Sequence, residues 1–281
     1  MNKIVLSILF FASTSAFAFK LPINKNLENI KMPAQFTTEY DFEGIVALSN
    51  CSGSLIQLEG VSDSNYALIL TNGHCVESGF TAPGSFVYQK PSSRSFTLLN
   101  SQAQNAGKVT ATQIVYSTMT KTDMTIYKLR ETYADIKAKF GIRPLILSSE
   151  HPQASQNIEV ISGYWKRGYS CTIDQFINTL KESDWTWVDS ARYTQPGCET
   201  IGGTSGSPIT KAGTKIVIGV NNTGNEDGEA CTLNNPCEVD QNGKINFAQG
   251  LSYGQQTYWV YSCLTTTNEI DLAVPGCALP H

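Results

Sequence analysis

Ala67-Leu68-Ile69-Leu70-Thr71-Asn72-Gly73-His74-Cys75 says more about the fold than any other stretch of the sequence. It begins as an apolar run of strand length and ends in a small turn that presents a histidine beside a cysteine. The run predicts a buried strand. A lone histidine is most often structural, so the interpretation of His74 depends on the rest of the chain.

Apolar runs of strand length recur along the sequence, and long helical periodicity is lacking. The predicted strands are 44–48, 53–58, 66–71, 95–99, 113–116, 124–128, 157–163, 186–191, 208–210 and 215–220. We expect one short helix at 133–140 and another near 258–264. Many closely spaced strands with few helices favour an all-β sandwich or barrel over a parallel α/β fold.

The composition excludes several classes of protein. The 281 residues include 20 basic and 24 acidic side chains, a formal charge of -4. Without a basic excess to neutralise phosphates, we expect no nucleic-acid partner. Hydrophobic residues make up 41% and charged residues 16% of the chain, which is typical of a folded globular protein rather than a disordered one.

The N-terminus has the three parts of a secretory signal peptide: Lys3, an apolar run over 4–11, and Ala16-Phe17-Ala18. We expect residues 1–18 to be removed. The run has about half of the ~20 residues that a membrane-spanning helix needs, so we expect no membrane anchor and a secreted, extracellular or periplasmic protein. Residues 19–42 are then either a short propeptide or an N-terminal arm.

The chain has eight cysteines, all after the predicted signal peptide, which agrees with an oxidising compartment. Eight cysteines allow 105 pairings. Sequential pairing is the simplest, and gives Cys51–Cys75, Cys171–Cys198, Cys231–Cys237 and Cys263–Cys277. There is no Cys-x-x-Cys or His-Glu-x-x-His motif and there are only three histidines, so we expect no metal site and no cofactor.

Two further segments carry polar groups in notable contexts. Asp123 stands at the start of the predicted strand 124–128, although an aspartate there is usually a turn former. Ser205 lies in Gly203-Thr204-Ser205-Gly206-Ser207-Pro208, where small neighbours would let backbone N–H groups approach a substrate oxygen. Glycine- and serine-rich runs are also ordinary loops.

Together, and in the order His74, Asp123, Ser205, these segments resemble the trypsin/chymotrypsin-like serine peptidase family. Thr71 to Cys75 is similar to the family's Thr-Ala-Ala-His-Cys, and Thr122 to Ile126 to its Asn-Asp-Ile-Ala-Leu. Gly203 to Pro208 resembles the nucleophile block of the secreted microbial glutamyl endopeptidases. Cys51 to Ile56 resembles the strand whose cysteine bridges to the one after the catalytic histidine.

The resemblance implies an all-β fold of two packed antiparallel six-stranded barrels, with a short C-terminal helix or tail. We expect the first barrel at 43–147, with His74 and Asp123, and the second at 148–281, with Ser205. Ser205 would be the nucleophile, His74 its general base, and Asp123 the group that orients the imidazole. The backbone N–H groups of Gly203 and Ser205 would form the oxyanion hole.

The same resemblance suggests the substrate-binding residues Glu199, Thr200, Asn221, Asn222 and Gly224. Glu199 would either line the specificity pocket and favour Arg or Lys, or face solvent. Thr200 matches the glutamyl endopeptidases, but Asn221 stands where they carry a histidine, so glutamyl specificity is not expected.

We therefore predict a secreted serine endopeptidase that acts on protein or peptide substrates through an acyl-enzyme, as a monomer. The alternative is a protease-like domain that binds or attaches without catalysis. An α/β-hydrolase is excluded because residue 207 breaks Gly-x-Ser-x-Gly, and only His281 follows Ser205.

Overall fold

The computed structural model describes residues 40–281. The predicted signal peptide 1–18, and residues 19–39 of the predicted arm or propeptide, lie outside the described residues. In the described part of the chain, every helix is too short or too polar to cross a bilayer.

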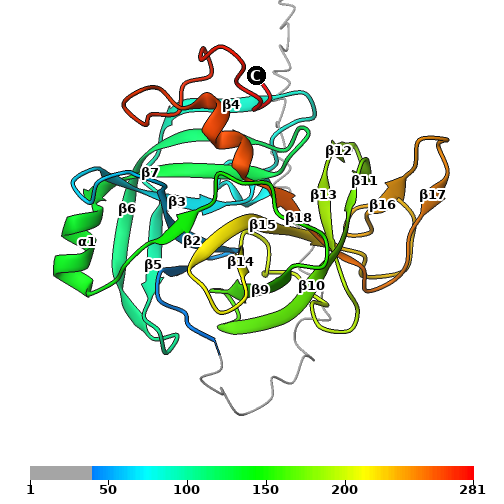
Figure 1. The fold of residues 1–281 in the computed structure, drawn as a ribbon, viewed down its shortest axis with the longest axis horizontal. Helices are drawn as coiled ribbons and strands as arrows, with labels where there is room; N and C mark the ends of the chain where they lie inside the picture. The colour runs from blue at the N-terminus through cyan, green and yellow to red at the C-terminus, as the bar shows by residue number, and fades with distance from the viewer. Residues whose placement is uncertain (1–39) are drawn as a thin grey trace, which may run out of the picture. The chain divides into compact units, whose positions relative to one another are not determined.

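The first half of this region forms a closed antiparallel barrel of six strands (Figure 1). The ring runs through β1 (Ile45–Ala47), β5 (Ser95–Leu99), β6 (Asn105–Thr118), β7 (Met124–Thr132), β3 (Tyr66–Thr71) and β2 (Ser52–Leu58), and β2 closes onto β1. Strand β4 (Phe86–Pro91) pairs with β6 outside the ring. Residues that alternate along these strands fill the interior with side chains such as Leu55, Ile69, Phe96 and Tyr127.

The second half forms another closed antiparallel ring of six strands. It runs through β9 (Asn157–Ser162), β10 (Arg167–Ile177), β13 (Ser190–Tyr193), β18 (Ser252–Gln256), β15 (Ile216–Gly224) and β14 (Pro208–Lys211), which returns to β9. Its interior contains Ile158, Val160, Tyr193, Ile209 and Ile218. The predicted all-β fold of two six-stranded barrels is confirmed.

A short strand joins the two rings. Strand β8 (Leu145–Leu147) pairs in parallel with β2 of the first barrel and with β15 of the second. Leu145 and Leu147 are buried in a core cluster to which both barrels contribute. The side chain of Thr122 also donates to the carbonyl of Gln256 (3.3 Å), so direct bonds cross between the barrels beside Asp123.

A small separate sheet lies beside the second barrel. Its four strands run in the order β12 (Trp185–Trp187), β11 (Leu180–Glu182), β16 (Cys237–Val239) and β17 (Ile245–Asn246). The sequence predicted one strand over 186–191, but β12 and β13 are distinct. Asp189 adopts a left-handed backbone conformation (φ +57°), which no continuous strand can accommodate.

The two helical predictions correspond to observed elements. Helix α1 (Tyr133–Phe140) begins in a capping box, in which Thr132 accepts from the Asp135 amide and Asp135 accepts from the Thr132 amide. It ends at Gly141, whose φ of +69° favours glycine. The C-terminal helix is η3 (Tyr258–Cys263), a 3-10 helix, followed by an irregular tail.

Four disulfides are present, and they pair the same cysteines as the sequential order: Cys51–Cys75, Cys171–Cys198, Cys231–Cys237 and Cys263–Cys277. Each closes a local loop, from 6 to 27 residues in sequence separation. Cross-links of this kind stabilise mainly by restricting the unfolded chain.

Candidate active site

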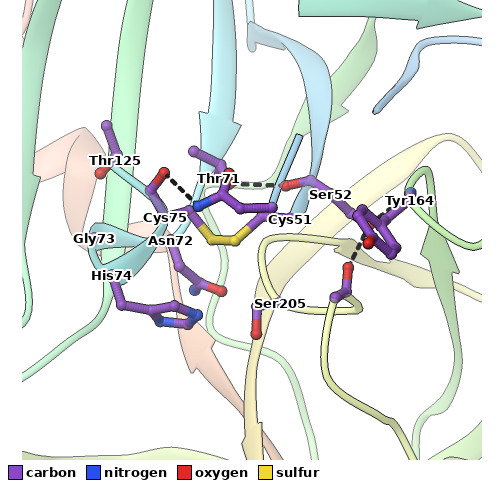
Figure 2. The surroundings of a disulfide bond; sticks show 12 residues. Cys51, Ser52, Thr71, Asn72, Gly73, His74, Cys75, Thr125, Tyr164 and Ser205 are labelled. Atoms are coloured by element: carbon purple, nitrogen blue, oxygen red, sulfur yellow. Dashed lines mark hydrogen bonds between the residues drawn. A yellow bond between two sulfur atoms is a disulfide. The ribbon is translucent and has the colours of Figure 1, made fainter. Parts of the chain in front are cut away.

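His74 lies in the 3-10 turn η2 (Gly73–Cys75), just beyond the end of β3. The turn is held by the bond from Cys75 to Cys51, which immediately precedes β2 (Figure 2). One residue before the turn begins, Asn72 is buried and donates its side-chain N–H to the Asp123 carbonyl (2.8 Å). Asn72 could not be singled out beforehand, because a buried asparagine and an exposed turn asparagine look alike in a sequence.

Gly73 packs too closely against a neighbouring strand for any side chain. A Cβ atom there would lie 2.0 Å from the Thr118 carbonyl oxygen. This contact accounts for a glycine at a position where the resembled family carries alanine.

We therefore expect Gly73→Ala to lower the free energy of unfolding by about 1 to 3 kcal/mol, because the backbone must move to relieve the overlap. Gly202→Ala is the control, since its nearest neighbour would be 3.7 Å away, an ordinary contact. Urea unfolding of both variants measures the difference. Equal stability of the two variants would show that the turn accommodates the added methyl group without a loss in the free energy of unfolding.

Asp123 holds the turn through both of its carboxylate oxygens. Oδ1 accepts from the amides of Gly73 (2.5 Å) and His74 (3.1 Å), and Oδ2 lies 2.7 Å from Nδ1 of the His74 ring. The carboxylate is fully buried. Because a carboxylate can only accept, Nδ1 of His74 carries the proton and Nε2 keeps a free lone pair.

The charge of Asp123 sets the basicity of this ring. Burial by itself lowers the pKa of His74, but the negative charge and hydrogen bond of Asp123, with a smaller contribution from Glu182, raise the pKa above its ordinary value. The side chain of His74 keeps 20% of its surface exposed, so a substrate can reach it.

Ser205 lies in the loop that precedes β14, and this loop is bonded to the first barrel. The Ser52 amide donates to the Ser205 carbonyl (2.8 Å), and the Gly206 amide donates to the Asn221 carbonyl (2.9 Å). Gly206 has a φ of +81°, and a Cβ atom there would lie 2.2 Å from both the Ser52 carbonyl and the Thr71 hydroxyl. The loop is therefore wedged between the barrels.

His74 and Ser205 line the same cavity. Figure 2 shows both residues near the Cys51–Cys75 disulfide. The Ser205 hydroxyl donates to the Asn222 carbonyl (3.1 Å). Among the described residues, no hydrogen bond joins this hydroxyl to His74. The sequence-predicted residues are thus brought together around one cavity, with the serine turned to a neighbouring carbonyl.

The backbone at Gly203 and Ser205 offers two free donors. Gly203 has a φ of +88°, which places this peptide in a conformation that favours glycine. Neither amide donates to any acceptor within the described part of the chain. Two neighbouring unpaired N–H groups beside a hydroxyl are the kind of donor that an oxyanion-binding site requires.

The cavity that His74 and Ser205 line measures about 580 Å³, a volume that includes open solvent at its mouth. Four of the five predicted substrate-binding residues line it: Thr200, Asn221, Asn222 and Gly224. Glu199 does not. Its side chain is exposed, and its carboxylate accepts from the Gly197 amide (3.1 Å), which corresponds to the solvent-facing alternative.

The cavity also contains residues that the sequence did not indicate. Five are apolar or aromatic: Phe80, Met119, Trp185, Trp187 and Leu233. The Phe80 ring packs edge-on against both His74 and Trp185. Two acids, Glu182 and Glu226, line the same space. They come from the small sheet and the loop after β15, whose positions no local sequence pattern reveals.

Cys51, His74 and Cys75 are the group of described residues whose potential metal ligands lie close together, within 4.8 Å of one another. Both sulfurs belong to the Cys51–Cys75 disulfide. Metal ligation by cysteine requires a thiolate, so this group does not form a metal site.

Two closed six-stranded barrels, with a His–Asp pair from the first and a serine loop from the second, define the fold class of the chymotrypsin-like serine proteases. The chain belongs to the family of the trypsin-like peptidase domain, whose family model matches residues 51–220. No curated protein sequence matches the chain.

Three solved structures illustrate the similarity. The protease domain of MamO from Magnetospirillum magneticum, in its apo form, is 12% identical, with a TM-score of 0.49, over 82% of this chain and 100% of that chain. The chymotrypsin of Cellulomonas bogoriensis is 15% identical, with a TM-score of 0.40, over 77% and 90%. The protease Anisep from Arthrobacter nicotinovorans is 13% identical, with a TM-score of 0.44, over 78% and 91%.

Proposed function

We propose that the protein is a secreted serine endopeptidase in which Ser205 is the nucleophile, His74 the general base and acid, and Asp123 the group that orients and stabilises the imidazole ring. The observation that carries this proposal is the shared cavity, into which one barrel brings the His74–Asp123 pair and the other brings Ser205. The four disulfides support an extracellular or periplasmic location. Because one chain supplies all three groups, we expect a monomer to be active.

The reaction proceeds through an acyl-enzyme. Ser205 Oγ attacks the carbonyl carbon of the scissile bond and transfers its proton to Nε2 of His74. The developing oxyanion accepts from the amides of Gly203 and Ser205. Collapse breaks the C–N bond, and the leaving amine takes the proton from Nε2. Water then repeats the sequence on the ester, and Ser205 regains its proton.

Substrate binding can also reorient the serine. An extended peptide that pairs with the backbone of Asn222 to Gly224 would bring its own N–H groups to this edge. If one of them donates to the Asn222 carbonyl, it competes with the Ser205 hydroxyl for that acceptor. The hydroxyl is then released to turn toward His74. Hydrogen bonds of this kind commonly tighten only when substrate is bound.

A second function, binding without catalysis, is favoured by one observation. The Ser205 hydroxyl donates to Asn222 rather than to His74. A protein that kept this arrangement with substrate bound would have the fold and pocket of a peptidase but no activated nucleophile.

Fluorophosphonate labelling of the secreted protein tests the proposal. We expect modification at Ser205, located by mass spectrometry, and none in His74→Ala. The labelling rate should be constant at high pH and fall about tenfold per unit below the pKa of His74, because the protonated ring cannot accept a proton. Since Asp123 raises this pKa, the midpoint should lie above the ordinary histidine value of about 6.5. Folded, disulfide-intact protein that does not label would support binding without catalysis.

A further inference from the structure

The cavity beside Ser205 contains a buried carboxyl group that the proposed mechanism does not use. Glu182 ends strand β11 and is only 6% exposed. Its Oε1 accepts from the Asn234 amide (2.9 Å). Its Oε2 is shielded from solvent and has no hydrogen-bond partner among the described residues. Half of this carboxyl group is thus left without a partner next to the reacting groups.

Three carboxyl side chains are buried in the described part of the chain: Asp123, Glu182 and Glu238. Asp123 pairs with His74, and Glu238 pairs with Arg192 (2.8 Å) and accepts from Tyr253 (3.0 Å). Glu182 takes part in no ion pair within residues 40–281. Burying a carboxylate without a cation is costly, and folded proteins normally supply the partner.

The cavity itself provides no cation for Glu182. Its titratable lining residues are His74, Asp123, Glu182 and Glu226. Of these, only His74 can carry a positive charge, and its Nδ1 is bonded to Asp123. Glu226, whose side chain is exposed, adds a further carboxyl group rather than a cation. Burial raises the pKa of Glu182, and a cation placed beside it would restore the ionised form.

The walls of the cavity suit the rest of a basic side chain. Phe80, Met119, Trp185 and Trp187 provide apolar and aromatic surface in the cavity that also contains Ser205, His74 and Glu182. The methylene groups of lysine or arginine can pack on such surface while the charged end reaches a carboxylate. The planar guanidinium of arginine can also stack on an indole ring.

We propose that Glu182 binds the cationic end of a lysine or arginine side chain that lies N-terminal to the scissile bond of the substrate. We place this side chain N-terminal to the bond because that stretch of substrate is the one proposed to pair with Asn222 to Gly224, and Thr223 of this edge lines the same cavity as Glu182. This inference rests on the proposed function, and it replaces Glu199 by Glu182 as the acid that selects basic substrates.

The test compares internally quenched peptides that carry lysine, arginine or norleucine at each of the four positions before the scissile bond. Norleucine keeps the lysine stem without the charge. With wild-type protein we expect kcat/KM to favour the basic residues at one of these positions. Glu182→Gln should reduce this preference about tenfold or more, the effect of one charge-assisted hydrogen bond. The exposed Glu199→Gln is the matched control and should keep the preference.

Two outcomes would overturn the assignment: equal cleavage of norleucine and lysine peptides by wild-type protein at every position, or a basic preference that survives in Glu182→Gln. Fluorophosphonate labelling of Ser205 in each sample separates this result from failure of the proposed function. An active nucleophile is labelled whichever substrates the enzyme prefers. If Glu182→Gln does not fold, the wild-type protein is tested by competitive inhibition instead. An alkylguanidinium is compared with its uncharged amide analogue, and the charged compound should inhibit more strongly. Equal inhibition by the two compounds rejects the role of Glu182.

Discussion

Replacing Ser205 by alanine is expected to lower kcat by about six powers of ten, because nucleophile and base act as one unit and the base has nothing to activate without the hydroxyl. The folded structure should not change. In the structure the Ser205 hydroxyl makes one hydrogen bond, to the Asn222 carbonyl, whereas its backbone carbonyl carries the bond from Ser52 that fixes the loop. Alanine retains that backbone bond. Residual activity is best measured with purified variant over long incubations.

Ser207 offers a matched control in the same loop. Its hydroxyl is buried and has no hydrogen-bond partner among the described residues. Ser207→Ala therefore removes a polar atom that contributes no bond, and we expect activity within a few-fold of wild type and stability equal or higher. Comparable losses in Ser205→Ala and Ser207→Ala would show that the loop is sensitive to any substitution. That result would remove the case for Ser205 as nucleophile.

The sequence predicted the fold best where apolar residues form a clear run, as in β3, or alternate with polar ones, as in β9. It missed β18, whose sequence Ser-Tyr-Gly-Gln-Gln lacks an alternating pattern although all five residues are buried. Gln255 and Gln256 donate their side-chain N–H groups inside the protein, to the Ser190 hydroxyl and the Asp189 carbonyl. Strand β10 was missed because it is long and mixed, with several exposed polar residues. The count of six strands per barrel came from the family resemblance, not from periodicity.

The candidate site likewise contains residues that the sequence could indicate and residues that it could not. His74, Asp123 and Ser205 could be singled out because each lies in a short local block that resembles a family motif. Glu182 could not, because Lys-Glu-Ser-Asp looks like an ordinary polar turn. Its importance depends on tertiary contacts: the Asn234 amide and the aromatic walls come from other segments. Family position pointed to Glu199 instead, whose carboxylate turns back to the Gly197 amide.

Asp123→Asn is expected to lower kcat by about four powers of ten, because an amide in place of the carboxylate would reverse the hydrogen bond to the ring. An amide N–H₂ group facing Nδ1 makes that nitrogen the acceptor and leaves the proton on Nε2, where it blocks transfer from Ser205. Loss of the negative charge should also lower the pKa of His74, since this charge raises it in the native protein. The acid limb of the pH–rate profile should therefore move to lower pH.

A second His–Asp pair in the same protein provides the control. Asp189 lies 3.0 Å from Nε2 of His151, and neither residue lines the cavity that contains Ser205. Asp189→Asn makes the same chemical change in a His–Asp pair that joins through Nε2 rather than Nδ1. Asparagine tolerates the left-handed backbone at this position (φ +57°). We expect kcat and the acid limb to stay unchanged in this variant. If Asp123→Asn instead retained the wild-type midpoint, the ring that titrates in the rate profile would not be paired with Asp123, and the assignment of His74 as the base would fail.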